Sequence, residues 1–307
     1  MNAKRPLWLL CLCLSLATDV VAQTARPANG LRERLELMRE ASKRERPVAL
    51  PAGARAQRNV AYGDDPAQRF DLYLPAGAKH APVFFYVHGG GWANGDKTNP
   101  GIENKIGYWL AKGYAVVSTN YRMLPGAAPL QQARDVAQAV ATAQRRAGEW
   151  GLDPARFVLV GHSAGAHLVA LLGASPNMLA AAGAQHPLGV VSLDSGALDV
   201  PALMGAPRLP KLYRNAFGDD KSYWIATSPQ HQLSRAALPM LIVCSSERRF
   251  PASPCDEGRK LARKAAALGV PMEVSPEPMS HAEINRELGS RSAYTEAVAK
   301  YIDSLVK

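Results

Sequence analysis

The 307-residue chain is poor in cysteine and in aromatic residues, with four cysteines and 7% Phe, Trp and Tyr. It also lacks internal repeats, low-complexity tracts and charged blocks that would divide the middle of the chain. Hydrophobic residues make up 47% of the chain and charged residues 20%, which is an ordinary globular composition and excludes a mainly disordered protein. One large domain is the simplest interpretation.

Long apolar runs are missing as well, apart from one at the N-terminus. Residues 7–17 are largely apolar, follow Lys4 and Arg5, and precede the small-residue site Val20-Val21-Ala22. This pattern predicts a signal peptide over residues 1–22 that is removed near Ala22. We therefore expect an exported protein, periplasmic or secreted, with no stable membrane anchor.

Cleavage after Ala22 leaves two cysteines, Cys244 and Cys255. In an oxidising compartment these are a candidate disulfide, and two buried free thiols are the alternative. No His or Cys pair has metal-ligand spacing with suitable neighbours, so the sequence implies neither a metal nor a cofactor.

The formal net charge of +10 suggests a nucleic-acid or membrane partner at first sight. The basic residues are scattered among acidic ones, however, and no recognition motif with interleaved aromatics is present. We therefore expect a solvated surface charge and no nucleic-acid partner.

Residues 23–58 are interpreted as a leader with a peripheral helix, and residues 59–307 as the main domain. Strand-like runs and helical patterns alternate through that domain, which predicts an α/β fold with a mostly parallel sheet of eight strands flanked by helices. Residues 194–239, after the sixth strand, are rich in Pro, Gly and aromatics and are predicted to form a cap-like wall of the substrate pocket. The expected strands are 60–62, 70–74, 83–87, 115–119, 157–160, 190–193, 240–243 and 272–274.

The pentapeptide Gly161-His162-Ser163-Ala164-Gly165 lies between an apolar strand and a helical pattern. A strand, a sharp turn and a helix raise a serine hydroxyl above the edge of a sheet, and the glycines relieve crowding at the turn. We therefore predict that Ser163 is a nucleophile. A serine in an ordinary glycine turn is the alternative.

His88-Gly89-Gly90-Gly91-Trp92 directly follows the strand-like run VFFYV. Three glycines allow backbone N–H groups to turn into a pocket, as an oxyanion hole requires. The predicted donors are the N–H groups of Gly90, Gly91 and Ala164. Glycine loops that bind phosphate have other spacings.

His281 follows the last expected strand, and Ser280 with Glu283 resembles a capping box at a helix start. A positive helix end disfavours protonation of an imidazole, so His281 is the predicted general base. It also occupies the place of the third member in the chain order serine, acid, histidine. A merely structural role is the alternative.

Three residues are candidates for the acid of a catalytic triad with Ser163 and His281. The loop after the seventh strand offers Glu247 and Asp256, and Asp256 is explained by helix capping after Ser253 and Pro254. Glu247 is therefore the predicted acid. Asp194, at the end of the sixth strand, is the remaining candidate, although a plain turn also accounts for it.

With these residues, the chain resembles α/β-hydrolase esterases that carry an HGGGW oxyanion loop, near the bacterial feruloyl-esterase-like and hormone-sensitive-lipase-like groups. The resemblance runs from about Asn59 to the C-terminus and includes YGDDPAQRFDLYLP, GGGWANGDK and HAEINRELG. It implies the α/β-hydrolase fold and hydrolysis of short-chain or aryl esters. These enzymes usually place an aspartate after the seventh strand, where this chain has Glu247 followed by Arg248 and Arg249.

The expected function is hydrolysis of small-molecule carboxylic esters through an acyl-enzyme. Aryl formamide or amide hydrolysis is the nearest alternative, because the same groups serve both bonds. An inactive hydrolase fold acting as a binding protein is the alternative from another class. The residues do not indicate the acyl or alcohol specificity or the oligomeric state.

Overall fold

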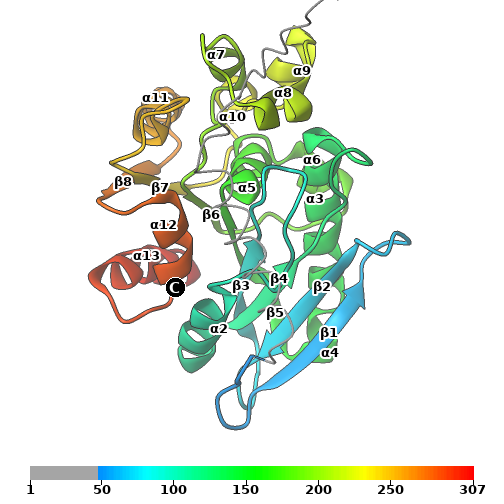
Figure 1. Ribbon diagram of the computed structural model, residues 1–307. Helices are drawn as coiled ribbons and strands as arrows, with labels where there is room; N and C mark the ends of the chain where they lie inside the picture. The colour runs from blue at the N-terminus through cyan, green and yellow to red at the C-terminus, as the bar shows by residue number, and fades with distance from the viewer. Residues whose placement is uncertain (1–47) are drawn as a thin grey trace, which may run out of the picture. The chain divides into compact units, whose positions relative to one another are not determined.

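A computed structural model describes residues 48–307, and the predicted signal peptide and peripheral helix lie outside them. One eight-stranded sheet has the order β1-β2-β4-β3-β5-β6-β7-β8 (Figure 1). Strand β2 pairs antiparallel with β1 and β4, and all other pairs are parallel. The mostly parallel sheet is thus confirmed, with strands β1 Arg55–Ala61, β2 Arg69–Leu74, β3 Ala81–Val87, β4 Ala115–Thr119, β5 Leu152–His162, β6 Gly189–Leu193, β7 Met240–Ser245 and β8 Met272–Glu277.

Strand β1 begins at Arg55, four positions before the expected domain boundary at Asn59. Its first residues are exposed, and only Val60 in this strand is buried. The backbone of β1 therefore pairs with β2 from Arg55 onward, whereas the apolar residues that indicate a strand in the sequence begin only near Val60.

Side chains of β3 alternate between two buried clusters. Val83, Phe85 and Val87 belong to one cluster, whereas Phe84 and Tyr86 belong to the other. Successive side chains of a strand point to opposite faces, so a strand that is apolar throughout is covered on both sides. Helices cover both faces of the sheet.

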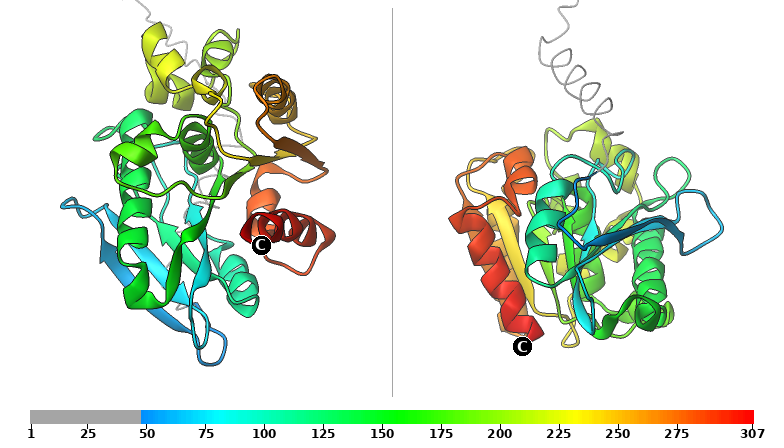
Figure 2. Two further views of the ribbon diagram at one scale, coloured as in Figure 1. Left: turned by 180° about the vertical axis from the view of Figure 1, so that it is seen from behind. Right: turned by 90° about the horizontal axis from the view of Figure 1, so that it is seen from below.

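Helices α3, α5 and α11 contribute to the first cluster, and α2 and α13 contribute to the second (Figure 2). The layered α/β architecture follows from this division. The helices are α2 Ile102–Ala111, α3 Pro129–Arg145, α4 Ala147–Trp150, α5 Ala164–Ala174, α6 Asn177–Ala181, α7 Val200–Met204, α8 Lys211–Phe217, α9 Lys221–Ala226, α10 Pro229–Gln232, α11 Pro254–Ala266, α12 His281–Glu287 and α13 Ala293–Val306.

The segment between β6 and β7 forms the short helices α7 to α10, which gather at one end of the molecule (Figure 1). A buried contact ties this segment to α5. Trp92 Nε1 donates to His167 Nδ1 at 3.2 Å, and His167 Nε2 lies 2.7 Å from the carbonyl oxygen of Thr227. Because Nδ1 accepts the Trp92 N–H and only Nε2 carries a proton, His167 is neutral, and burial lowers its pKa to about 4.

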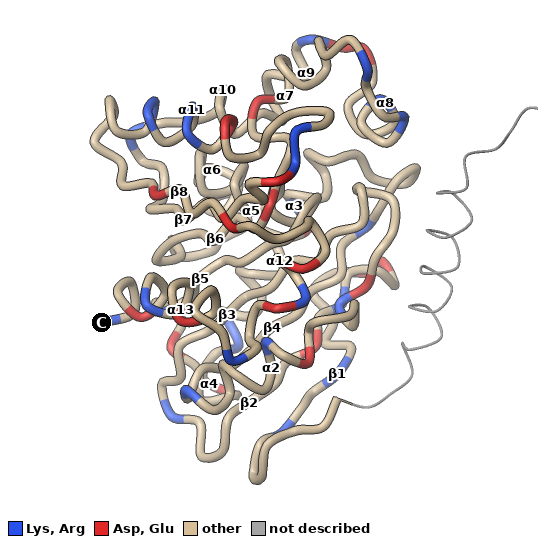
Figure 3. The backbone as a smooth tube through the Cα atoms, turned by 60° about the vertical axis from the view of Figure 1, so that its left-hand side comes forward, with Lys and Arg blue, Asp and Glu red and all other residues tan. Residues whose placement is uncertain are grey.

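Within residues 48–307, no helix combines the length and apolar character needed to cross a membrane. Basic and acidic residues are interspersed along the elements (Figure 3).

Candidate active site

Ser163 occupies a sharp turn between β5 and α5. Its backbone has φ 56° and ψ −116°, a conformation that non-glycine residues seldom adopt. Its N–H donates to the carbonyl oxygen of Leu193 at 3.0 Å, which fixes the turn to the end of β6. Strain of this kind is typical of functional positions, and here it presents the Ser163 hydroxyl beyond the strand.

The two glycines that flank this turn are required by close backbone contacts. A Cβ at Gly161 would lie 2.3 Å from the carbonyl oxygen of Gly165. A Cβ at Gly165 would lie 2.2 Å from the carbonyl oxygen of Val87. The first and last residues of the G-x-S-x-G motif thus allow α5 to pack directly against the sheet.

His281 is the first residue of α12, and the predicted capping box is present. Ser280 Oγ accepts the Glu283 N–H, and the Glu283 carboxylate accepts the Ser280 N–H at 2.9 Å. This cap fixes where the helix begins and therefore where the imidazole lies. His281 Nε2 is 3.0 Å from Ser163 Oγ, as a general base for that hydroxyl requires.

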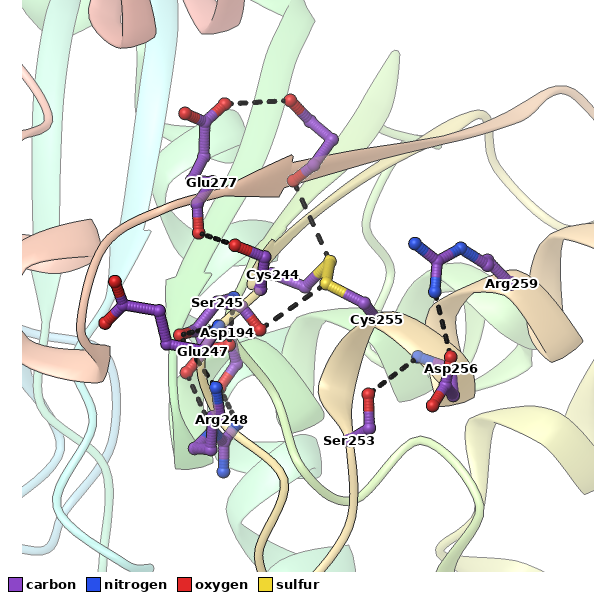
Figure 4. Close-up of a disulfide and its surroundings, with 12 residues drawn as sticks. Asp194, Cys244, Ser245, Glu247, Arg248, Ser253, Cys255, Asp256, Arg259 and Glu277 are labelled. Carbon is purple, nitrogen blue, oxygen red and sulfur yellow. Dashed lines mark hydrogen bonds and ion pairs between the residues drawn. A yellow bond between two sulfur atoms is a disulfide. The ribbon is translucent and has the colours of Figure 1, made fainter.

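The acid against His281 is Asp194, and the prediction of Glu247 is wrong. Asp194 Oδ2 lies 2.6 Å from His281 Nδ1, and its side chain is fully buried. Glu247 is exposed, and its carboxylate turns away from Asp194 (Figure 4). The two candidates follow adjacent parallel strands, β6 and β7, but only Asp194, directly after β6, points at the imidazole.

Asp256 occupies the place that helix capping predicts. Its N–H donates to Ser253 Oγ at 3.3 Å at the start of α11, and its exposed carboxylate pairs with Arg259 at 2.8 Å. It takes no part in the contact with His281.

The Asp194 carboxylate is held by groups from three elements. Its Oδ2 faces His281 and lies 3.0 Å from Arg248 Nε, and its Oδ1 accepts the Ser245 N–H at 2.8 Å. Burial raises the pKa of this carboxyl, but the hydrogen bond from His281 and the positive charge of Arg248 outweigh burial and lower it. Asp194 is therefore ionised, and His281 carries its proton on Nδ1, which leaves Nε2 free to accept.

His162 contacts the backbone of His281. The sequence pattern did not indicate this role, apart from the place of His162 in the G-x-S-x-G motif. Its Nε2 is 2.9 Å from the carbonyl oxygen of His281, and the two rings are 4.5 Å apart. Burial and the neighbouring His281 lower the pKa of His162 well below its usual value. His162 is thus a neutral donor that fixes the backbone of His281.

Two of the three predicted oxyanion donors lie at the pocket. Gly91 and Ala164 line it beside Ser163, whereas Gly90 does not. Within the described residues, no backbone acceptor takes the N–H of Gly91 or Ala164. Gly90 shapes the loop. Its φ is 128°, and a Cβ added at this position would lie 1.9 Å from the Asn94 carbonyl oxygen, so no other residue fits.

The pocket at Ser163 and His281 has a volume of about 310 Å³ and a mainly apolar wall. Side chains of the segment after β6 form part of that wall, as the sequence predicted. A hollow of about 520 Å³ beside α13 is larger, but it is lined by charged side chains and includes neither Ser163 nor His281. The pocket wall is made by Trp92, Pro210, Leu212, Tyr213, Phe250 and Pro251.

Cys244 and Cys255 lie with their sulfur atoms 2.04 Å apart, which is the distance of a disulfide (Figure 4). They bracket the segment that carries Arg248 and the Ser245 N–H, both of which contact Asp194. Within residues 48–307, no group of three or more His, Cys, Asp or Glu is placed to hold a metal ion.

The mostly parallel sheet, the sharp serine turn between β5 and α5, and the histidine after the last strand define the α/β-hydrolase fold, and comparison with solved structures shows the same fold. Esterase B from Lactobacillus rhamnosus superimposes with a TM-score of 0.69 at 20% identity, covering 91% of this chain and 94% of that one. Esterase 2 from Thermogutta terrifontis gives a TM-score of 0.67 at 22% identity, covering 85% and 97%.

Sequence comparisons point to esterases. Residues 70–189 match the family model described as BD-FAE. Esterase LipC of Mycobacterium tuberculosis is 35% identical over 125 residues, which are 39% of this chain and 30% of that protein. Isoprenylcysteine alpha-carbonyl methylesterase ICME of Arabidopsis thaliana is 27% identical over 237 residues, or 71% and 54% of the two chains. The matches thus span about a third to a half of these curated relatives.

Proposed function

We propose that this protein hydrolyses carboxylic esters of small molecules, with Ser163 as nucleophile, His281 as base and Asp194 as acid. The observation that carries the proposal is the continuous chain of contacts from Ser163 Oγ to His281 at 3.0 Å and from His281 to Asp194 at 2.6 Å, at the wall of a pocket. An inactive hydrolase fold would have no reason to keep this geometry together with the strained turn at Ser163.

In the first half of the reaction, Ser163 Oγ attacks the ester carbonyl carbon and its proton passes to His281 Nε2. The N–H groups of Gly91 and Ala164 hold the oxyanion that forms. The bond from carbon to the alcohol oxygen then breaks, and the leaving alcohol takes the proton from His281.

In the second half, water attacks the acyl-enzyme and gives a proton to His281. The bond to Ser163 Oγ breaks, the acid is released, and Oγ recovers its proton. Asp194 stays ionised throughout and stabilises the imidazolium formed in each half.

The pocket supports short-chain or aryl esters as the substrate class. Its volume of about 310 Å³ and its apolar and aromatic wall suit a small acyl or aryl group. The test is a panel of p-nitrophenyl esters from acetate to dodecanoate with an aryl formamide alongside, assayed with wild type and Ser163→Ala. Ester turnover that falls with long chains and disappears in Ser163→Ala supports the proposal. Faster turnover of the formamide than of the esters would indicate an amide hydrolase instead of an esterase.

Export and a disulfide complete the proposal. The N-terminal pattern ending at Ala22 and the sulfur positions of Cys244 and Cys255 both support an oxidising destination. The test is mass spectrometry of the protein exported by a bacterial host. We expect an N-terminus at Gln23 and no alkylation of either cysteine before reduction; an intact N-terminus in the cytosolic fraction would contradict export.

A further inference from the structure

Arg248 reaches Asp194 from the segment after β7, and the catalytic steps above do not use it. Its Nε lies 3.0 Å from Asp194 Oδ2, the same oxygen that faces His281. Its Nη2 donates to the backbone carbonyl oxygen of Asp194 at 2.9 Å. The Arg248 side chain is 18% exposed and that of Asp194 is fully buried, so the charges meet largely out of water.

The surroundings hold the guanidinium in this position. A Cβ at Gly196 would lie 2.8 Å from Arg248 Nη1, so only glycine leaves room for the side chain over the turn after Asp194. Tyr213 and Arg248 both line the pocket, and the positive charge of the guanidinium opposes the rise that burial gives the pKa of Tyr213. The disulfide closes the segment that carries it.

The positive charge of Arg248 beside Asp194 Oδ2 has two consequences. The Asp194 carboxylate is fixed in the orientation that meets His281 Nδ1, because Arg248 and the Ser245 N–H hold it on both sides. The negative charge that His281 experiences is also partly offset, and a carboxylate without that offset favours the protonated imidazole more strongly.

We propose that Arg248 is a positioning residue for the Asp194–His281 pair, which holds the acid toward the base and keeps the imidazole unprotonated, and hence able to act as a base, to a lower pH. The inference rests on the proposed function for its kinetic readout. It adds a group from the segment after β7 to a site whose acid directly follows β6.

Other ionisable groups near the pair come from several elements and are the same in wild type and variants. Burial lowers the pKa of one of them, Lys105 on α2, to about 7, so its titration overlaps the range of interest but cancels in the comparison. The groups are His162, Lys105, Tyr213, Glu257, Glu283 and Tyr294.

The test is the pH profile of kcat/KM for an aryl ester between pH 5 and 9. In Arg248→Met the acidic limb should move upward by on the order of one pH unit, and kcat on the plateau should fall about tenfold. Arg248→Lys keeps the charge without the planar fork, so its limb should stay near that of wild type while kcat remains reduced. Arg249→Met, one position along and exposed, removes the same charge and should leave the limb in place.

A readout without turnover separates this inference from the proposed function. Histidine ¹⁵N NMR, with His281→Asn as assignment control, should show the same upward displacement of the His281 titration midpoint in Arg248→Met. If wild type shows no activity dependent on Ser163, the proposed function fails and the NMR titration still tests Arg248. A folded Arg248→Met protein with the wild-type midpoint and limb would overturn the inference.

Gly196→Ala serves if Arg248→Met does not fold. The added methyl group must displace Arg248 Nη1 while its charge remains in the chain. We expect lower kcat and an acidic limb moved in the same direction by a smaller amount, and an unchanged profile with unchanged kcat would also overturn the inference.

Discussion

Oδ2 of Asp194 lies 2.6 Å from Nδ1 of His281, although 87 positions separate the two residues in the chain. Asp194 has a positive φ of 54°, as Ser163 has at the end of the neighbouring strand. Their N–H groups donate to carbonyl oxygens of the next strands, Ser163 to Leu193 and Asp194 to Val243. The backbones of both residues are thus fixed by hydrogen bonds at the same edge of the sheet.

Replacing Asp194 by Asn should lower kcat about 10³- to 10⁴-fold, because an amide at this place no longer stabilises the imidazolium and favours the wrong tautomer. The matched control is Glu247→Gln, for which we expect kcat within about twofold of wild type. Steady-state kinetics with a p-nitrophenyl ester measure both. A larger loss in Glu247→Gln than in Asp194→Asn would restore Glu247 as the acid.

The loop that carries Gly91 should tolerate no side chain at Gly90. Gly90→Ala places a Cβ against the Asn94 carbonyl oxygen and reshapes the loop, so kcat should fall about 100-fold or more with a smaller change in KM. Gly77→Ala is the control, because Gly77 also has a positive φ, 62°, but has open space around it. Equal losses in the two variants would mean that backbone strain, and not the oxyanion site, explains the effect.

Glu257 on α11 should make stability depend on pH. Burial raises the pKa of its carboxyl from 4.5 to about 7, against the opposing hydrogen bond from the Leu198 N–H. Between these values the folded protein binds more protons than the unfolded chain, so the contribution of Glu257 to stability falls as pH rises. At pH 8 the penalty is on the order of 3 kcal/mol.

Glu257→Gln should therefore be more stable than wild type at pH 8, and this advantage should shrink steadily toward pH 5. Urea unfolding of both proteins at several pH values measures it. A difference that is constant with pH would show that Glu257 does not titrate in this range.

The disulfide should stabilise the protein by about 3 kcal/mol, because it closes a loop of 11 residues. Reductant should lower the melting temperature of wild type, whereas Cys244→Ala/Cys255→Ala should melt at one temperature with or without reductant. Differential scanning calorimetry tests this. If reductant lowers both proteins equally, the cysteines are not bonded in solution.

The sequence allowed the fold to be predicted because every strand leaves a short apolar signal and the intervening helices leave apolar stripes. Ser163 and His281 were predictable for the same reason, since Ser163 directly follows β5 and His281 begins the helix after β8. The acid was not, because Asp194 and Glu247 follow neighbouring strands and the choice depends on a backbone turn at Asp194 that no spacing reveals. The contact of Arg248 with Asp194 was not predicted either, because the two residues lie 54 positions apart and follow different strands.

The most direct test of the account is reaction of the protein with a fluorophosphonate probe, with the modified peptide located by mass spectrometry. An activated serine reacts with such a probe, whereas ordinary serines do not. The account predicts labelling at Ser163 alone, slowed in His281→Asn and absent in Ser163→Ala. Labelling that persists in Ser163→Ala, or a folded wild-type protein that does not react, would contradict it.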